Sequence, residues 1–149
     1  MDKERDTLIA DIEKISKRVE EIFSTASKDI IVEGHFAVDV VPPERVTVVF
    51  VLRRDPDELR RTLKSRSYND EKIRENLAAE ILDVCLYDAV KRCGVEKICE
   101  IDVSQKSVDE VVQEVLEVLN GRREKRVGIV DWLGKLESEG KLDEFLEGF

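Results

Sequence analysis

The run VTVVFVL, from Val46 to Leu52, decides the fold of this chain. Its residues are almost all apolar and β-branched, and apolar positions do not alternate with polar ones. A strand with one face in water would alternate, so this run predicts a strand that is covered on both faces, as in a parallel sheet flanked by helices. The run therefore predicts an α/β fold.

Two other short runs are predicted to be strands of the same sheet. DIIVE, from Asp29 to Glu33, is β-branched and is bounded by Ser27 and Gly34. KICEIDV, from Lys97 to Val103, lies further along the chain. With helical patterns between them, the order is helix, strand, strand, two helices, strand, helix, tail. This order is typical of an α/β domain with a parallel sheet.

Helix-start signals mark the segments around these strands. Asp55 is expected to cap a helix that runs to about Arg66, and Glu58 is expected to complete a capping box with it. Ser107 and Glu110 form a second capping box after the third strand. Apolar periodicity predicts two further helices, one from about Thr7 to Phe23 with a single buried stripe and one from about Asp70 to Gly94.

Composition limits the classes of protein that the chain can belong to. Its 149 residues carry a net charge of −9, which argues against a protein that coats nucleic acid nonspecifically. No apolar run approaches the roughly 18 residues of a membrane helix, and the first residues lack the apolar core of a signal peptide. We therefore expect a soluble, cytoplasmic protein. Its three cysteines show no CxxC spacing, so we expect buried thiols rather than disulfides or a zinc site.

Residues that directly follow the predicted strands are the candidates for chemistry, because ligands of α/β sheets bind beyond the carboxyl ends of the strands. Glu33 and the only histidine, His35, follow the first strand. A carboxylate beside an imidazole can hold a magnesium-bound water or orient a proton acceptor. The alternative is a loop histidine next to a surface glutamate.

Three polar segments carry similar alternatives. The segment from Arg53 to Arg74 holds eight basic and five acidic residues, which suits either a polyphosphate site or solvated helix faces. The loop from Ser104 to Ser107 can contact a base or phosphate, or can simply cap a helix. The cluster RREKR, from Arg122 to Arg126, is either a contact for RNA or ribosomal protein or a solvated linker.

Several linked motifs resemble one known family. DIIVEGHFA (Asp29 to Ala37) is followed by VVFVLRRDPDELRRTLKSRSYNDEKIREN (Val48 to Asn76), and then by AAEILDV (Ala78 to Val84) and CEIDVSQKS (Cys99 to Ser107). In this order they resemble the small nucleotide kinases of the adenylate kinase isoenzyme six type, which include the coilin-interacting nuclear ATPase and its archaeal relatives. The resemblance implies a three-layer α/β/α fold of the P-loop nucleoside-monophosphate kinases, with a parallel sheet.

The resemblance also implies roles for particular residues. Glu33 and His35 match the acid and histidine that organise Mg²⁺ and the attacked phosphate, with Glu33 acting on the metal indirectly. The other matched residues are those of the lid and its phosphate contacts (Arg66, Tyr68, Arg74 and Asn76) and those beside the nucleotide base (Ser104 and Lys106). ATP, AMP and Mg²⁺ are the ligands that the resemblance implies, and a small-subunit ribosomal protein or rRNA is the partner.

One motif of that family is missing from these residues. The phosphate loop Gly-x-x-x-x-Gly-Lys-Ser/Thr does not occur, and the Gly-Lys pairs at 134–135 and 140–141 are each followed by Leu. We therefore expect a kinase core truncated at its amino terminus, without the first strand, in residues 1–120, with a lid at about 64–75 and a helical tail in 121–149. A second chain or a dimer could complete the sheet. The alternative function is a non-catalytic binding module or half of a split kinase.

Overall fold

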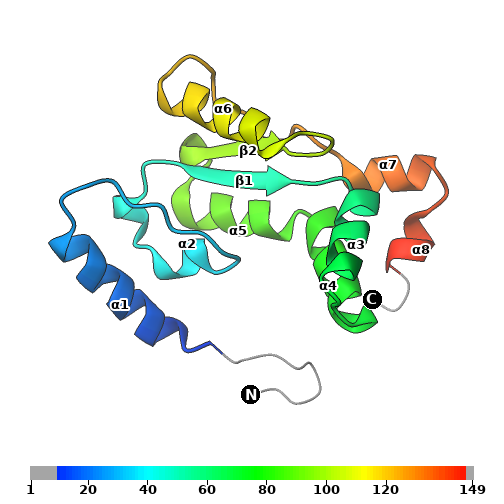
Figure 1. Ribbon diagram of the computed structural model, residues 1–149, viewed down its shortest axis with the longest axis horizontal. Helices are drawn as coiled ribbons and strands as arrows, with labels where there is room; N and C mark the ends of the chain where they lie inside the picture. Colours follow the sequence, from blue (N-terminus) through cyan, green and yellow to red (C-terminus); the bar gives the residue numbers. More distant parts are fainter. Residues whose placement is uncertain (1–9, 147–149) are drawn as a thin grey trace.

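The computed structural model describes residues 10–146, and its centre is a pair of parallel strands. Strands β1 (Val49–Arg53) and β2 (Ile98–Asp102) are paired in register, with Val49 opposite Ile98 and Arg53 opposite Asp102. They confirm the strands that the sequence predicts at 46–52 and 97–103. The fold is therefore helix-rich α/β with a small parallel sheet (Figure 1).

Helices cover both faces of this pair, which explains why the run from Val46 to Leu52 lacks alternation. Helix α5 (Val84–Cys93) lies on one face, where Val51 and Ile98 pack with Ala89. Helix α6 (Val108–Leu119) lies on the other face, where Ile101 packs with Val111 (Figure 1). The cover is incomplete, because Leu52 on β1 is still 53% exposed.

A second apolar cluster joins the helices after β1 to the end of the chain. Helices α3 (Pro56–Ser65) and α4 (Asp70–Ile81) pack against α7 (Trp132–Ser138) and α8 (Leu142–Leu146). The buried members of the cluster are Leu63, Ile73, Leu77, Ile81, Trp132, Leu136 and Phe145. The carboxyl-terminal helices are thus part of the core of the described chain.

The predicted strand from Asp29 to Glu33 is wrong. These residues form an irregular segment in which Ile31 is 95% exposed. A β-branched run becomes a strand only where its backbone finds a pairing edge, and in the described residues β1 pairs with β2 alone. The chain here runs instead from α1 (Ile12–Thr25) to two short turns, α2 (Ala37–Val40) and the 3-10 helix η1 (Pro43–Arg45).

The predicted single helix from Asp70 to Gly94 is two helices. The chain leaves α4 at Leu82, and Asp83 adopts a left-handed backbone conformation with φ of 57° before α5 begins. Aspartate is one of the few residues that tolerate this conformation. The break brings the Asp83 carboxylate onto the Arg53 guanidinium. A second 3-10 helix, η2 (Val95–Lys97), connects α5 to β2.

Helix α1 confirms the predicted amino-terminal helix, but the predicted buried stripe is wrong. Residues 7–9 of the predicted helix lie outside the described residues. None of the residues of α1 is buried, and Ile15 and Ile22 are 39% and 44% exposed. Helix α1 contacts α2 and lies apart from the strands (Figure 1), so its apolar side is only partly covered by the described residues.

Both predicted helix caps are present, but one capping box is not. The Asp55 carboxylate accepts hydrogen bonds from the backbone N–H groups of Asp57 and Glu58, and Ser107 and Glu110 make the reciprocal box. Glu58 cannot return a bond to Asp55, because the Asp55 N–H donates to Ser104 Oγ. Across residues 10–146, no helix is both long and apolar enough to pass through a membrane.

Candidate functional site

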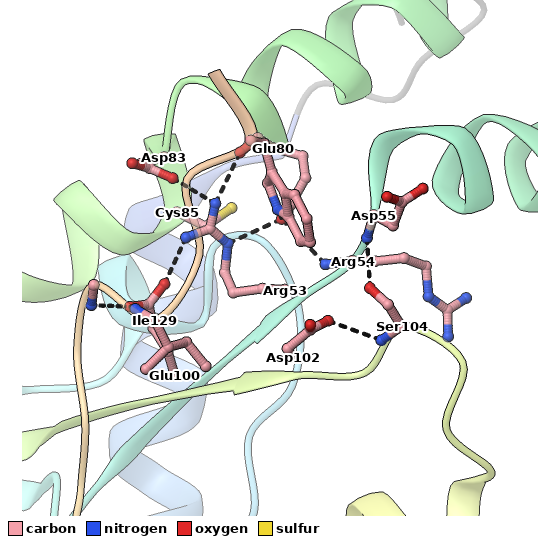
Figure 2. A network of polar contacts seen from close by, with 12 residues as sticks. Arg53, Arg54, Asp55, Glu80, Asp83, Cys85, Glu100, Asp102, Ser104 and Ile129 are labelled. Carbon is pink, nitrogen blue, oxygen red and sulfur yellow. Dashed lines mark hydrogen bonds and ion pairs between the residues drawn. The ribbon is translucent and has the colours of Figure 1, made fainter. Parts of the chain in front are cut away.

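The carboxyl ends of the two strands form one polar corner (Figure 2). The Asp55 N–H donates to Ser104 Oγ at 2.7 Å, and the Ser104 N–H donates to Asp102 Oδ1 at 2.9 Å. The Val103 N–H donates to the Arg53 carbonyl at 2.8 Å, which extends the strand pairing by one step. The loops that follow β1 and β2 therefore lie together, as a parallel pair requires.

Asp55 links this corner to the carboxyl-terminal helices. One carboxylate oxygen caps α3, and the other pairs with Lys135 Nζ from α7. Burial by itself raises the pKa of the Asp55 carboxyl, but the hydrogen bonds from Lys135 and from the Glu58 N–H outweigh it and hold the pKa below its usual value. Asp55 is thus a fixed anion with both oxygens occupied.

Arg53 is the centre of a buried ionic cluster on the α5 side of the strands (Figure 2). Its Nη1 lies 2.5 Å from Glu100 Oε1, its Nε lies 2.9 Å from Glu80 Oε1, and its Nη2 pairs with Asp83. The side chains of Arg53 and Glu100 are 2% and 0% exposed. Burial alone lowers the pKa of the Arg53 guanidinium, but these carboxylates outweigh it, so the pKa is raised and the group stays charged.

The same carboxylates hold the chain after α6. Glu100 Oε2 accepts from the N–H groups of Gly128 and Ile129, and Glu80 Oε1 accepts from the Trp132 indole at 2.8 Å. Sequence reasoning missed this cluster. Two signals were available, Arg53 at the end of one apolar strand and Glu100 inside the other. A charged side chain that is buried in a strand needs a partner of opposite charge.

Glu33 and His35 lie in the irregular segment before α2, and both are exposed. His35 Nδ1 is 3.8 Å from the Sγ of Cys85, near the start of α5. Cys93 and Cys99 are buried as predicted, but Cys85 is exposed, so the prediction for that thiol is wrong. Glu33 makes no hydrogen bond or ion pair with any described residue, which leaves its carboxylate available to a ligand.

The four predicted lid residues lie on the turn between α3 and α4 and on α4 itself. The exposed side chains of Arg66 and Arg74 form no ion pair with a described residue. Tyr68 packs on the second apolar cluster, and the ammonium of Lys72 lies 4.2 Å from its ring centroid. Asn76 Nδ2 donates to the Lys72 carbonyl within the helix. The two arginines are therefore the available cations of this group.

Of the two residues predicted to lie beside a nucleotide base, only Ser104 is at the polar corner. Lys106 Nζ pairs with Glu114 on α6 at 2.5 Å, and Glu114 also pairs with Arg123. No hydrogen bond or ion pair between described residues joins Glu33, His35, Arg66 or Lys106 to another member of that set. The structure therefore assembles the strand ends without bringing these predicted residues into contact.

A magnesium ion fits this donor set only as a partly hydrated ion. In residues 10–146 no group of three His, Cys, Asp or Glu side chains is arranged to hold a metal ion. Mg²⁺ usually keeps several waters and takes one or two carboxylates together with substrate phosphates. The exposed carboxylate of Glu33 meets that requirement, and the phosphates of a nucleotide would supply the remaining oxygens.

Comparisons with known proteins give the relatives of the chain. Residues 1–83 match the family described as AAA domain. A protein of Methanosarcina barkeri is 37% identical over 142 residues, covering 89% of this chain and 74% of that protein. One of Archaeoglobus fulgidus is 35% identical over 150 residues, covering 98% and 76%. A third, of Thermococcus onnurineus, is 37% identical over 127 residues, covering 85% and 66%.

All three relatives carry the name "Putative adenylate kinase". The match to the AAA domain spans more than half of this chain, and the first two alignments span more than two thirds of each relative. The chain therefore belongs to the AAA domain family and to the group of archaeal proteins that carry this name.

Proposed function

We propose that this chain is a nucleotide-binding protein of the adenylate kinase type. It takes ATP with Mg²⁺ and transfers the terminal phosphoryl group to AMP or to water. The observation that carries this proposal is the similarity of nearly the whole chain to archaeal proteins named for that activity. The polar corner beyond the parallel strands supports it, because ligands of α/β sheets bind at that end.

Each predicted site residue has a role in this proposal. Glu33 holds hydrated Mg²⁺, His35 orients the attacked phosphate, and Arg66 closes on the nucleotide from the lid at 64–75. Tyr68, Arg74 and Asn76 support the lid, and Ser104 and Lys106 lie beside the base. Glu33 and Arg66 are exposed and form no ion pair with another described residue, which supports their roles. Lys106 has to exchange its Glu114 partner before it can contact a ligand.

Phosphoryl transfer also needs a cradle for the phosphates, since positioning and electrostatics supply nearly all of the catalysis. The motif Gly-x-x-x-x-Gly-Lys-Ser/Thr does not occur in these 149 residues. The proposed reaction therefore depends on a cradle from outside them, supplied by polypeptide that completes the sheet beside β1. In this proposal residues 1–120 are the nucleotide-binding core and residues 121–149 are its carboxyl-terminal tail. Helices α7 and α8 of the tail pack on the core.

A second candidate function is a cytoplasmic binding or assembly module. Two features favour it, because such surfaces usually meet a partner. One is the edge of β1 that no described strand covers, and the other is the set of exposed apolar side chains at Leu52, Val112 and Leu116. The partner that the family resemblance implies is a small-subunit ribosomal protein or rRNA. In this role the nucleotide would be bound without being turned over.

Calorimetric titration with AMP, ADP and ATP–Mg²⁺, together with a phosphoryl-transfer assay, tests the proposal. We expect ADP to bind to the wild-type chain. The Arg66→Ala variant should bind ADP about tenfold more weakly, because it loses one charged hydrogen bond. Arg45→Ala is the matched control, because Arg45 is also exposed and unpaired among the described residues. Failure of every nucleotide to bind would favour the binding module.

The same assay tests the need for an external cradle. The isolated 149-residue chain is expected to show no turnover above that of the double variant Glu33→Ala, Arg66→Ala. A robust rate that these substitutions abolish would show that the chain cradles the phosphates with its own residues.

A further inference from the structure

We propose that Arg54 binds a phosphate group at the carboxyl ends of β1 and β2. The identity of the whole ligand as a nucleotide rests on the proposed function, but the phosphate subsite rests on the surroundings of this one side chain. Arg54 directly follows the last residue of β1. It lies in the basic segment from Arg53 to Arg74, but the proposed function gives it no role.

The position of Arg54 is set by strand geometry. Successive side chains of a strand point to opposite faces. Arg53 turns towards α5 and its carboxylates, whereas Arg54 turns towards α3 and the loop after β2 (Figure 2). The Asp55 N–H bond to Ser104 Oγ holds that loop against the end of β1. The guanidinium of Arg54 therefore lies in the corner where the two strand-end loops meet.

Arg54 and Arg53 differ in how their charges are balanced. Arg53 pairs with three carboxylates. Arg54 makes one side-chain contact with a described residue, from Nη1 to the Thr62 hydroxyl at 3.4 Å, and forms no ion pair with any of them. The Thr62 hydroxyl already donates to the Glu58 carbonyl, so it offers Arg54 a neutral and distant acceptor.

The acids around Arg54 are occupied by other groups. Asp55 caps α3 and pairs with Lys135, and Asp102 accepts from the Ser104 N–H. Glu80 pairs with Arg53, and Glu58 accepts from the Gln105 N–H at 3.3 Å. No carboxylate of the described chain therefore forms an ion pair with the Arg54 guanidinium.

Burial separates Arg54 from the solvated arginines of this chain. Arg61, Arg66 and Arg74 are exposed, and water satisfies their charges. Arg54 is half-buried, and its Nε is fully shielded from solvent with no hydrogen-bond partner. A buried donor without a partner costs free energy, and such groups are uncommon in folded proteins. An anion bound at the exposed part of the guanidinium would supply the ion-pair partner that the described residues do not.

Phosphate is the anion that fits this position. A guanidinium presents a planar fork of donors that matches two phosphate oxygens, and it remains charged at every physiological pH. The corner also lies at the end of the sheet where ligands of α/β proteins bind. The subsite would thus hold a phosphate of the nucleotide proposed above, or free pyrophosphate.

Titration of the whole chain with pyrophosphate, ADP and adenosine tests this subsite. We expect Arg54→Met to lower the affinity for pyrophosphate and for ADP about tenfold or more. The affinity for adenosine, if it binds, should stay within about twofold of the wild-type value. Arg54→Lys, which keeps the charge but loses the fork, should lie between Met and wild type. Arg45→Met removes a positive charge before the opposite end of β1. It should leave the affinities for pyrophosphate, ADP and adenosine unchanged.

The ligand-free stability of the same variants gives a second readout. Arg54→Met removes the unpaired buried donor, so its urea midpoint should equal or exceed that of Arg45→Met. A fall below that control would show that the arginine is structural. Arg54→Lys keeps the binding test available if the Met variant folds poorly.

Each binding outcome separates the subsite from the proposed function. Equal affinity of wild type and Arg54→Met for pyrophosphate and ADP would overturn the subsite alone. Pyrophosphate binding that depends on Arg54, without binding of any nucleotide, would support the subsite and overturn the proposed function. A wild-type chain that binds neither pyrophosphate nor ADP would overturn both.

Discussion

Arg53 and Glu100 show, at the scale of single residues, how two charges enter the interior of a small α/β protein. They face each other across the strand pair on the α5 side, and the backbone N–H groups of Gly128 and Ile129 complete the hydrogen bonding of the glutamate. The two charged side chains can be buried because each has hydrogen-bonding partners of its own. Removing one charge would leave the opposite buried charge uncompensated.

The variant Glu100→Gln tests this description. It preserves shape but removes the charge opposite Arg53, so we expect the free energy of unfolding to fall by about 3 kcal/mol. Urea unfolding measures the change. Glu137→Gln is the control, because Glu137 is exposed and its side chain forms no hydrogen bond or ion pair with a described residue. Equal midpoints for the two variants would show that the buried pair contributes little.

At the scale of elements, local signals in the sequence predict the structure well. The Asp55 and Ser107 caps place the starts of α3 and α6, and the runs at 46–52 and 97–103 place β1 and β2. These features depend on residues close in the chain. The segment DIIVE has the composition of a strand, but pairing is a tertiary event that composition does not supply.

The candidate site follows the same division between local and tertiary signals. Residues that follow neighbouring parallel strands are expected to lie together, and Ser104 does lie beside Asp55. The role of Ser104 at a nucleotide base stays a prediction. The rule for strand ends does not foresee that Lys106 pairs with Glu114, or that Asp83 breaks the long helix to reach Arg53. Both contacts join residues that only the folded chain brings together, so a single sequence carries no direct signal for them.

The packing of α8 gives a prediction at this scale. Phe145 is 1% exposed, and the Arg60 guanidinium lies 3.7 Å from its ring centroid, so this short helix is anchored on α3. We expect Phe145→Ala to lower the free energy of unfolding by about 3 kcal/mol, as for other buried aromatics. Leu133→Ala, at a position 41% exposed on α7, should change it by less than about 0.5 kcal/mol. Urea unfolding of both variants measures the difference.

At the scale of the whole molecule, ion pairs tie the carboxyl-terminal segment to the strand core. Lys135 on α7 reaches Asp55 at the end of β1, and Arg123 reaches Glu114 on α6. Burial raises the pKa values of both carboxyls, but their cationic partners outweigh it and lower them overall. Both carboxyls therefore bind protons less readily in the folded chain than in the unfolded one, and the fold is expected to weaken in acid.

The variant Asp55→Asn isolates one of these pairs, because asparagine can still cap α3 but cannot pair with Lys135 as an anion. The contribution of the Asp55 charge is complete above its usual pKa of 3.8 and is lost as the pH falls through the lower folded value. We expect wild type to be more stable than the variant by about 1 kcal/mol at pH 7, and the gap to close as the pH falls below about 4. Urea unfolding of both proteins from pH 7 to pH 3 measures the gap. Asp143→Asn serves as control, since Asp143 is exposed and unpaired among the described residues. A gap that stays constant down to pH 3 would show that the Asp55 carboxylate stabilises the fold through its cap alone.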